Sequence, residues 1–222
     1  MRCQHDQQDY QLVDILPFPH FDLLESMMKS DKSASSPTAN QWLATYYFLR
    51  AGVSLAWIAL AVLLGRHDAT LAALLLVIYP AWDAFANYLD ARRNGGLIDN
   101  PTQTLNLVIS AVVTVAIGWA LTIGMPATIK VFGTWAILSG LLQLATAVRR
   151  WKTSSGQWVM ILSGAQSAAA GVFFFKVAAS GAALGVVTVA PYAALGAVYF
   201  LISAVWLTVK NRRRHATERA DR

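Results

Sequence analysis

The chain has 222 residues, of which 56% are hydrophobic and 14% are charged, and its formal net charge is +6 at pH 7. Because soluble proteins use about 25% charged residues, this deficit excludes an ordinary soluble domain and indicates an integral membrane protein. The positive charge does not indicate nucleic acid, since the basic residues border apolar runs, where they set topology and contact anionic lipid headgroups. These clusters are Arg92 and Arg93; Arg149, Arg150 and Lys152; and Lys210 to Arg214, which includes Arg212, Arg213 and Arg214.

Residues 1–41 are polar with an acidic bias, which predicts a mostly disordered cytoplasmic leader. The alternative is a short amphipathic helix on the membrane surface, from about Phe21 to Met28. The first 25 residues contain no continuous apolar segment, so we expect no secretory signal. Cys3 is the only cysteine, which leaves no partner for an intramolecular disulfide.

Six apolar segments follow, each long enough to cross a hydrocarbon core of about 30 Å at about 1.5 Å per helical residue. They cover approximately residues 42–64, 69–89, 104–123, 131–148, 158–177 and 184–209. Pro191 interrupts the last segment and is expected to kink or delay that helix. The sequence therefore predicts an all-α, polytopic membrane protein, with a bundle of six transmembrane helices over residues 42–209 and a basic cytoplasmic tail over residues 210–222.

The distribution of Lys and Arg predicts the orientation in the membrane. With the N-terminus inside, 14 of these residues lie in cytoplasmic segments and only three on the opposite side. Such an asymmetry follows the positive-inside rule and predicts that both termini are cytoplasmic. We expect a multi-pass membrane protein.

An internal repeat relates the segments to one another. Residues 83–93 read DAFANYLDARR and residues 140–150 read GLLQLATAVRR, two stretches of eleven residues that both end in Arg-Arg and are offset by 57. A weaker third copy ends the sixth segment as SAVWLTVKNRR. A recurring period of this size indicates one supersecondary unit used repeatedly, so we expect three helical hairpins.

The hairpin from Phe132 to Phe175 carries a family resemblance. GTWAILSGLLQLATAVRR followed by WVMILSGAQSAAAGVFFF resembles the HdeD family of bacterial acid-resistance membrane proteins, which is built from a short repeat. The resemblance covers Ala69 to Arg214 and implies a six-helix inner-membrane protein associated with acid or envelope stress, without catalytic residues. Asp83, in place of the usual small residue, and the long leader depart from the pattern. The residues that match it are Gly133, Trp135, Gly140, Arg149, Trp158, Gly164 and Gly171.

Arg50 and Asp83 are the two charges deep within the predicted spans. They lie at equal sequence distance from the first turn, centred at 66.5, so an antiparallel hairpin places them at the same depth and predicts an ion pair. The structural interpretation, in which the pair fixes the hairpin, is favoured over a proton-responsive switch. A further alternative is that Arg50 extends to the cytoplasmic interface and leaves Asp83 protonated.

Uncharged polar and small residues predict helix contacts. Asn87 and Asn106 are equally distant from the next turn, which predicts an interhelical amide hydrogen bond, and Gln143 and Gln166 lie at comparable depths. Helix adhesion is favoured over a solute pathway for these side chains. Small residues that recur on one face of a helix, mostly at a spacing of four, predict close approach of helix backbones, within the chain or in a homo-oligomer. The small residues concerned are Gly133, Gly140, Ser163, Gly164, Ser167 and Gly171.

Catalytic and ligand-binding motifs are not found. The four His residues lie in tails or loops without metal-ligand spacing, and neither a phosphate-binding loop nor a nucleophile elbow occurs. We therefore expect no enzyme activity, cofactor or metal. Three functions remain: a non-enzymatic stress protein of the HdeD type, a small-solute or proton transporter that uses Arg50 and Asp83, and a membrane adaptor that acts through its cytoplasmic tails.

Overall fold

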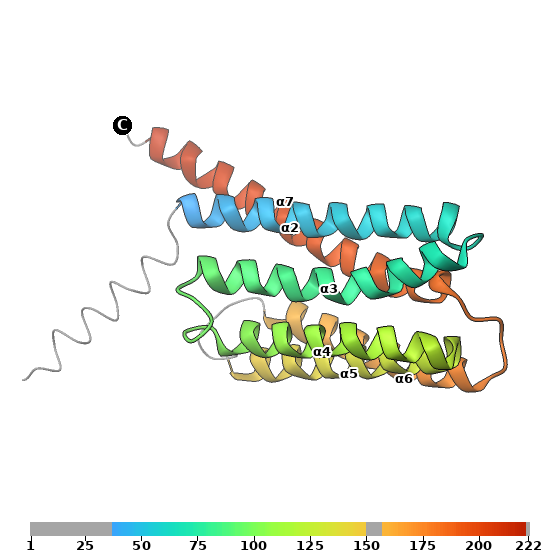
Figure 1. Cartoon of the computed structure of the whole chain (residues 1–222). Helices are drawn as coiled ribbons and strands as arrows, with labels where there is room; N and C mark the ends of the chain where they lie inside the picture. Colours follow the sequence, from blue (N-terminus) through green and yellow to red (C-terminus); the bar gives the residue numbers. More distant parts are fainter. Residues whose placement is uncertain (1–36, 150–156, 221–222) are drawn as a thin grey trace, which may run out of the picture. The chain divides into compact units, whose positions relative to one another are not determined.

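The computed structural model describes residues 37–149 and 157–220, and every regular element in these ranges is helical (Figure 1). The leader predicted for residues 1–41 lies outside the described residues up to residue 36, including the alternative helix at Phe21 to Met28, whereas residues 37–41 belong to the first helix and not to a disordered leader. The six long helices are α2 (Pro37–Leu60), α3 (Ala69–Arg93), α4 (Pro101–Ile123), α5 (Met125–Arg149), α6 (Gln157–Ala179) and α7 (Ala190–Ala220). A π-helical turn, η1 (Ala61–Gly65), extends α2, and a 3-10 turn, η2 (Val186–Val189), precedes α7.

Six helical stretches are long and apolar enough to cross a membrane, which confirms the predicted all-α membrane architecture. They are Gln41–Gly65, Ala69–Arg93, Pro101–Ile123, Met125–Ala145, Ile161–Ala179 and Val186–Arg213.

The chain divides into two compact units. Thr45–Trp206 contains the greater part of all six helices, while Met1–Ala44 and Leu207–Arg222 form the other unit, in which α2 begins and α7 ends. Within Thr45–Trp206 the turn between α3 and α4 lies at one end of the bundle and the turn between α4 and α5 at the other (Figure 1).

Local chemistry explains where the helices begin. The Asp68 carboxylate caps α3 by accepting hydrogen bonds from the backbone N–H groups of Thr70 at 2.8 Å and Leu71 at 3.0 Å. Pro101 begins α4, where its fixed φ fits and its missing N–H is not needed. Pro191 lies in the first turn of α7, so this proline delays the sixth helix, which begins at Ala190 after η2.

The link between α4 and α5 is shorter than the sequence predicts. GMPATIK was expected to connect two spans, with the fourth beginning near residue 131, but Gly124 alone makes the turn and α5 begins at Met125. Gly124 has φ +136°, a conformation that glycine adopts without a steric penalty. Pro126 then lies in the first helical turn, where proline is tolerated.

Helices α5 and α6 are in backbone contact. A Cβ atom added to Gly140 would lie 2.5 Å from the Gly164 carbonyl oxygen, and one added to Gly171 would lie 2.5 Å from the Gly133 carbonyl oxygen. Only residues without a side chain allow the two backbones to come so close. Within lipid no hydrophobic effect drives helices together, and dispersion contact between the backbones stabilises the pair instead. Ser167 adds a hydrogen bond of 2.9 Å to the Ala136 carbonyl oxygen across the same pair of helices.

An apolar core fills the part of the bundle near the α4–α5 turn. Its fully buried side chains include Leu76, Ile117, Ile129, Phe132 and Val189. Large aromatic rings continue this core toward the middle of the helices, where Tyr79 and Trp135 meet edge to face at a centroid distance of 5.7 Å. This end of the bundle is therefore closed by packed side chains.

Candidate functional site

An ion pair joins α2 to α3 inside the span region. The Arg50 Nη2 atom contacts the Asp83 Oδ1 atom, and both side chains are largely buried, with 14% and 19% of their surface exposed. Arg50 also donates through Nη1 to the Tyr46 hydroxyl at 3.2 Å, and Tyr46 in turn donates to the Ala86 carbonyl oxygen at 3.0 Å. The two charges that the sequence places at one depth are thus paired and hydrogen-bonded.

The second carboxylate oxygen of Asp83 extends this network to α4 and, through Ser110, to α5. The Oδ2 atom accepts hydrogen bonds from Asn87 Nδ2 at 3.0 Å and from Ser110 Oγ at 2.9 Å. Ser110, which is only 1% exposed, accepts in turn from the indole Nε1 of Trp135 at 3.0 Å. Since Arg50 lies on α2, Ser110 on α4 and Trp135 on α5, removal of this carboxylate disturbs contacts among all four helices.

Aromatic rings surround the guanidinium. The Cζ atom of Arg50 lies 4.2 Å from the ring centroid of Phe200 on α7 and 5.8 Å from that of Tyr46. Both distances fall within the range of cation–π attraction. Phe200 also stacks on Tyr47, with 6.1 Å between centroids and an interplanar angle of 20°. The Arg50 Nε atom is buried and has no hydrogen-bond partner among the residues that the structure describes.

A cavity of about 530 Å³ opens beside this network. All six long helices line it, and Leu195 supplies the only aliphatic side chain among the lining residues. Three lining residues are charged: Arg50, Asp83 and Asp90. The uncharged polar residues are Ser54, Asn87, Thr102, Gln103, Asn106, Ser139, Gln143, Ser163, Gln166, Ser167 and Ser203, and the aromatic residues are Tyr46, Tyr47, Tyr79, Trp82, Trp135, Tyr192, Tyr199 and Phe200.

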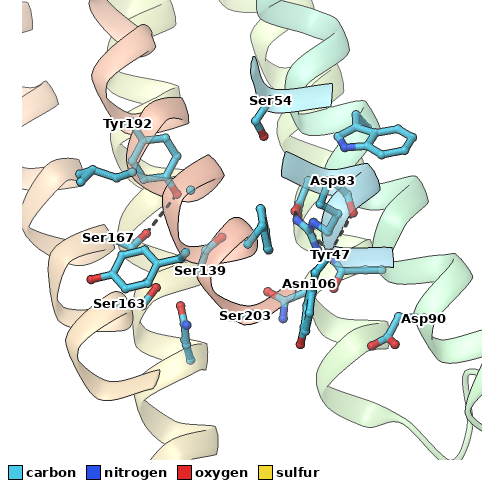
Figure 2. Close-up of a pocket in the computed structure, with 18 of the residues that line it drawn as sticks. Tyr47, Ser54, Asp83, Asp90, Asn106, Ser139, Ser163, Ser167, Tyr192 and Ser203 are labelled. Carbon is cyan, nitrogen blue, oxygen red and sulfur yellow. Dashed lines mark hydrogen bonds and ion pairs between the residues drawn. The ribbon is translucent and has the colours of Figure 1, made fainter. Parts of the chain in front are cut away.

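The cavity has two different walls. Figure 2 shows Ser139, Ser163, Ser167 and Tyr192 on one side of the gap and Asp83, Asn106 and Asp90 on the other. On the first wall the hydroxyl groups of Ser167 and Tyr192 lie 3.0 Å apart in a hydrogen bond. One wall is therefore rich in hydroxyl groups and the other carries the charges.

The mouth and the floor of the cavity can be assigned from the helices. Asp90 and Gln103 flank the α3–α4 turn and are joined by a hydrogen bond of 3.1 Å, so the cavity extends to that end of the bundle, and we call this part its mouth. Tyr79, Trp135 and Tyr192 line the opposite part, where Trp135 meets Tyr192 at a centroid distance of 6.1 Å. Below these rings lies the apolar core, which closes the floor.

Three serine–aromatic pairs repeat along the chain. In each pair a serine on one helix is followed 25 positions later by an aromatic residue on the next helix. Successive pairs are offset by 56 and 57 residues, which matches the period of the sequence repeat. Hydrogen bonds join Ser110 to Trp135 between α4 and α5 and Ser167 to Tyr192 between α6 and α7, and Ser54 and Tyr79 stand at the equivalent positions of α2 and α3.

The asparagine and glutamine side chains that were predicted to pair across helices have other partners in the structure. Asn87 donates to the Asp83 carbonyl oxygen at 2.8 Å and to its carboxylate, within α3, rather than to Asn106. The carboxylate is the stronger acceptor, and it lies one turn away on the same helix. Asn106 lines the cavity. Gln143 and Gln166 line it as well, and Gln166 accepts a hydrogen bond from Tyr199 on α7.

The structure describes some residues of the predicted basic clusters and not others. Arg92 and Arg93 are exposed in the last turn of α3, and Arg212 and Arg213 are exposed on α7. Arg150 and Lys152 lie outside the described residues, as do the side chains of Arg149 and Arg214. Ser163 and Ser167, which were predicted to pack helices, both line the cavity.

Sequence reasoning missed Ser110, Tyr46 and Phe200. A signal existed for Ser110, because it follows the centre of the turn predicted between the second and third segments, at 96.5, by as many residues as Asp83 precedes it. No sequence pattern distinguishes Phe200 from the other aromatic residues of α7. Among the residues that the structure describes, no three His, Cys, Asp or Glu side chains are grouped to hold a metal ion.

Comparison with known proteins gives one match. The family model for a short repeat of unknown function (DUF308) matches residues 108–176, from α4 to near the end of α6. Neither the curated proteins nor the solved structures yield a match to the chain. The matched region includes Ser110, Trp135 and the glycines of the α5–α6 contact.

Proposed function

We propose that this chain is a non-enzymatic protein of the bacterial inner membrane that acts under acid or envelope stress, and that its cavity binds a small polar solute in that role. The short-repeat match supports the first part, because HdeD-type membrane proteins contain this repeat. The resemblance of Phe132 to Phe175 to the HdeD pattern points in the same direction.

The polar cavity is the observation that carries the proposal. Polar side chains within membrane spans are costly and commonly face a water-filled cavity or a substrate pathway. Here three charged and eleven uncharged polar residues from six helices line one space. Its volume of about 530 Å³ falls in the range of small-molecule sites, roughly 300–1,000 Å³. Helix adhesion alone does not require such a space.

The positive-inside rule supports a cytoplasmic mouth. Asp90 and Gln103 mark the cavity opening beside the α3–α4 turn, and Arg92 and Arg93 are exposed at the same end of α3. Basic residues next to a span favour the cytoplasmic side and anionic headgroups. The solute would therefore enter from the cytoplasm.

The ion pair would shape the cavity wall in this role. The Asp83 carboxylate already accepts from Arg50, Asn87 and Ser110, which leaves little capacity for a further proton donor. We therefore assign Arg50 and Asp83 to positioning the cavity wall rather than to carrying protons.

Acid-shock survival of a deletion strain tests the proposal. Reintroduction of the wild-type chain should restore survival and internal pH, whereas Ser203→Leu, which fills the cavity, should not. Ile202→Leu is the matched control, because Ile202 is the neighbouring residue and is 58% exposed on the outside of α7. Equal survival of the deletion and wild-type strains would contradict the stress role. Full rescue by Ser203→Leu would contradict the role of the cavity.

Transport of a small solute or of protons is the second candidate function. The observation that favours it is the depth of the cavity, which reaches Tyr79, Trp135 and Tyr192 in the middle of the helices. Transport would require these rings to separate, because the apolar core closes the floor. Proteoliposomes containing a pH-sensitive dye test proton transport, and leak rates equal to those of empty vesicles would exclude it.

A further inference from the structure

We propose that the cavity binds a small organic cation, an ammonium or guanidinium compound, close to Asp90 and the aromatic side chains of the mouth. The inference rests on the proposed solute-binding role and specifies the class of solute. Charge balance, aromatic lining and hydrogen-bonding capacity support it independently.

The charges that line the cavity leave one negative charge without a compensating cation. Arg50 and Asp83 neutralise each other in their ion pair. Asp90 is held by neutral amides, with Asn94 Nδ2 at 2.9 Å from Oδ1 and Gln103 Nε2 at 3.1 Å from Oδ2. Arg50 is the one basic side chain among the residues that line the cavity, and it is paired with Asp83 rather than with Asp90. A cation in the mouth would supply the missing charge.

The aromatic lining suits a cation as well. Eight aromatic residues line the cavity, and the negative face of such a ring attracts a cation within about 6 Å. The protein already uses this property, since the Arg50 guanidinium lies 4.2 Å from the Phe200 centroid. Tyr47, which stacks on Phe200, lines the same cavity as Asp90.

The hydroxyl wall supplies acceptors for the N–H groups of such a ligand. Ser139, Ser163 and Ser203 line the cavity beside the Ser167–Tyr192 pair, and a hydroxyl oxygen accepts hydrogen bonds (Figure 2). An anion would instead meet Asp90 and the negative ring faces, with the only lining cation already paired. A neutral solute would leave Asp90 uncompensated.

Binding to the purified full-length chain in lipid nanodiscs tests the inference. The probe is tetramethylammonium, with tert-butanol as its neutral analogue of similar shape and acetate as the anion, measured by isothermal titration calorimetry. We expect tetramethylammonium to bind at least about tenfold more tightly than tert-butanol, and acetate not to bind. Equal binding of the neutral analogue, preferred binding of acetate, or no binding of tetramethylammonium would overturn the inference.

Substitutions of Asp90 and Tyr47 test where in the cavity the cation binds. Asp90→Asn should weaken tetramethylammonium binding about tenfold, while Asp90→Glu should retain most of it. Asp68→Asn is the matched control, because it removes a carboxylate outside the cavity and keeps a residue that caps α3. Tyr47→Leu should weaken binding and Tyr47→Phe should not. Unchanged affinity in Asp90→Asn, in a variant that stays monodisperse, would overturn the assignment.

The outcomes separate this inference from the proposed function. If tert-butanol binds as well as tetramethylammonium and Ser203→Leu abolishes both, the cavity binds solutes but does not select cations. If the deletion strain survives acid normally while tetramethylammonium binds as expected, the cation site remains and the stress role fails.

Discussion

The α3–α4 and α5–α6 pairs come from equivalent parts of the repeat, yet different forces hold them together. In α5–α6, Gly140 brings the backbones into contact at Gly164. At the equivalent position of α3, 57 residues earlier, the chain has Asp83, which binds Ser110 on α4 through its side chain. One pair is held by dispersion contact and the other by charged and polar groups.

This difference explains the position of the cavity. A glycine contact leaves no space between helices, whereas a buried carboxylate requires partners of its own. Asp83 recruits Arg50 from α2, and the guanidinium in turn lies against Phe200 of α7. A single change from a small residue to a carboxylate in one copy of the repeat thus accompanies a charged wall that the other copy lacks.

The largest effect is expected for Asp83→Leu. The substitution leaves the Arg50 charge buried without a partner and also removes acceptors for Asn87 and Ser110, so we expect a loss of about 3–5 kcal/mol of stability. The measurement is thermal denaturation in detergent, followed by size-exclusion chromatography. The double variant Arg50→Met/Asp83→Leu should recover part of the loss. A double variant as unstable as the sum of the two single variants would contradict the coupling.

Gly140→Ala tests the other side of the comparison. The new Cβ atom would lie 2.5 Å from the Gly164 carbonyl oxygen and 2.7 Å from the Ala168 backbone nitrogen, so α5 and α6 must separate. We expect a loss of about 2–3 kcal/mol in the same assay. Gly118→Ala on α4 is the control, because its Cβ would meet nothing within 4 Å, and it should be neutral or slightly stabilising. Equal effects of the two substitutions would contradict the close contact.

Much of the fold could be predicted because membrane spans have a strong local signal. Length, hydropathy and the period of 57 residues indicated six helices in hairpins, and the equal depths of Arg50 and Asp83 followed from helix geometry alone. The α4–α5 turn was misjudged because one glycine with φ +136° makes it, and the flanking residues GMPATIK are typical of a longer loop.

The cavity could not be predicted from the same signals. Equal depth brings two residues to one level of the bundle, but it does not specify the direction of each side chain around the helix. Asn87 and Asn106 share a depth, yet Asn87 is bound to Asp83 within α3. The contribution of α7 depends on packing between segments far apart in the sequence, as the contact of Arg50 with Phe200 shows.

Ser110→Ala and Ser167→Ala compare the same position in two copies of the repeat. Ser110 is buried, and its loss leaves the Trp135 indole N–H and one Asp83 oxygen each short of a partner, so we expect about 1–2 kcal/mol of destabilisation. Ser167 faces the cavity, where water can replace its bond to Tyr192, so we expect about 0.5 kcal/mol. Thermal denaturation in detergent gives both values, and a larger effect at Ser167 would reverse the ranking of the two copies.

The smallest effect is expected for Tyr192→Phe. The ring keeps its edge-to-face contacts with Trp135 at 6.1 Å and Phe174 at 6.0 Å, and Ser167 keeps its bond to the Ala136 carbonyl oxygen. Only one hydrogen bond beside a polar cavity is lost, so we expect a change below about 0.5 kcal/mol. Tyr192→Leu is the matched comparison, since it also removes the ring and should cost about 2 kcal/mol or more. If Tyr192→Phe were as damaging as Tyr192→Leu, the hydroxyl group and not the ring would hold the floor of the cavity, and the serine–aromatic pairs would be its main support.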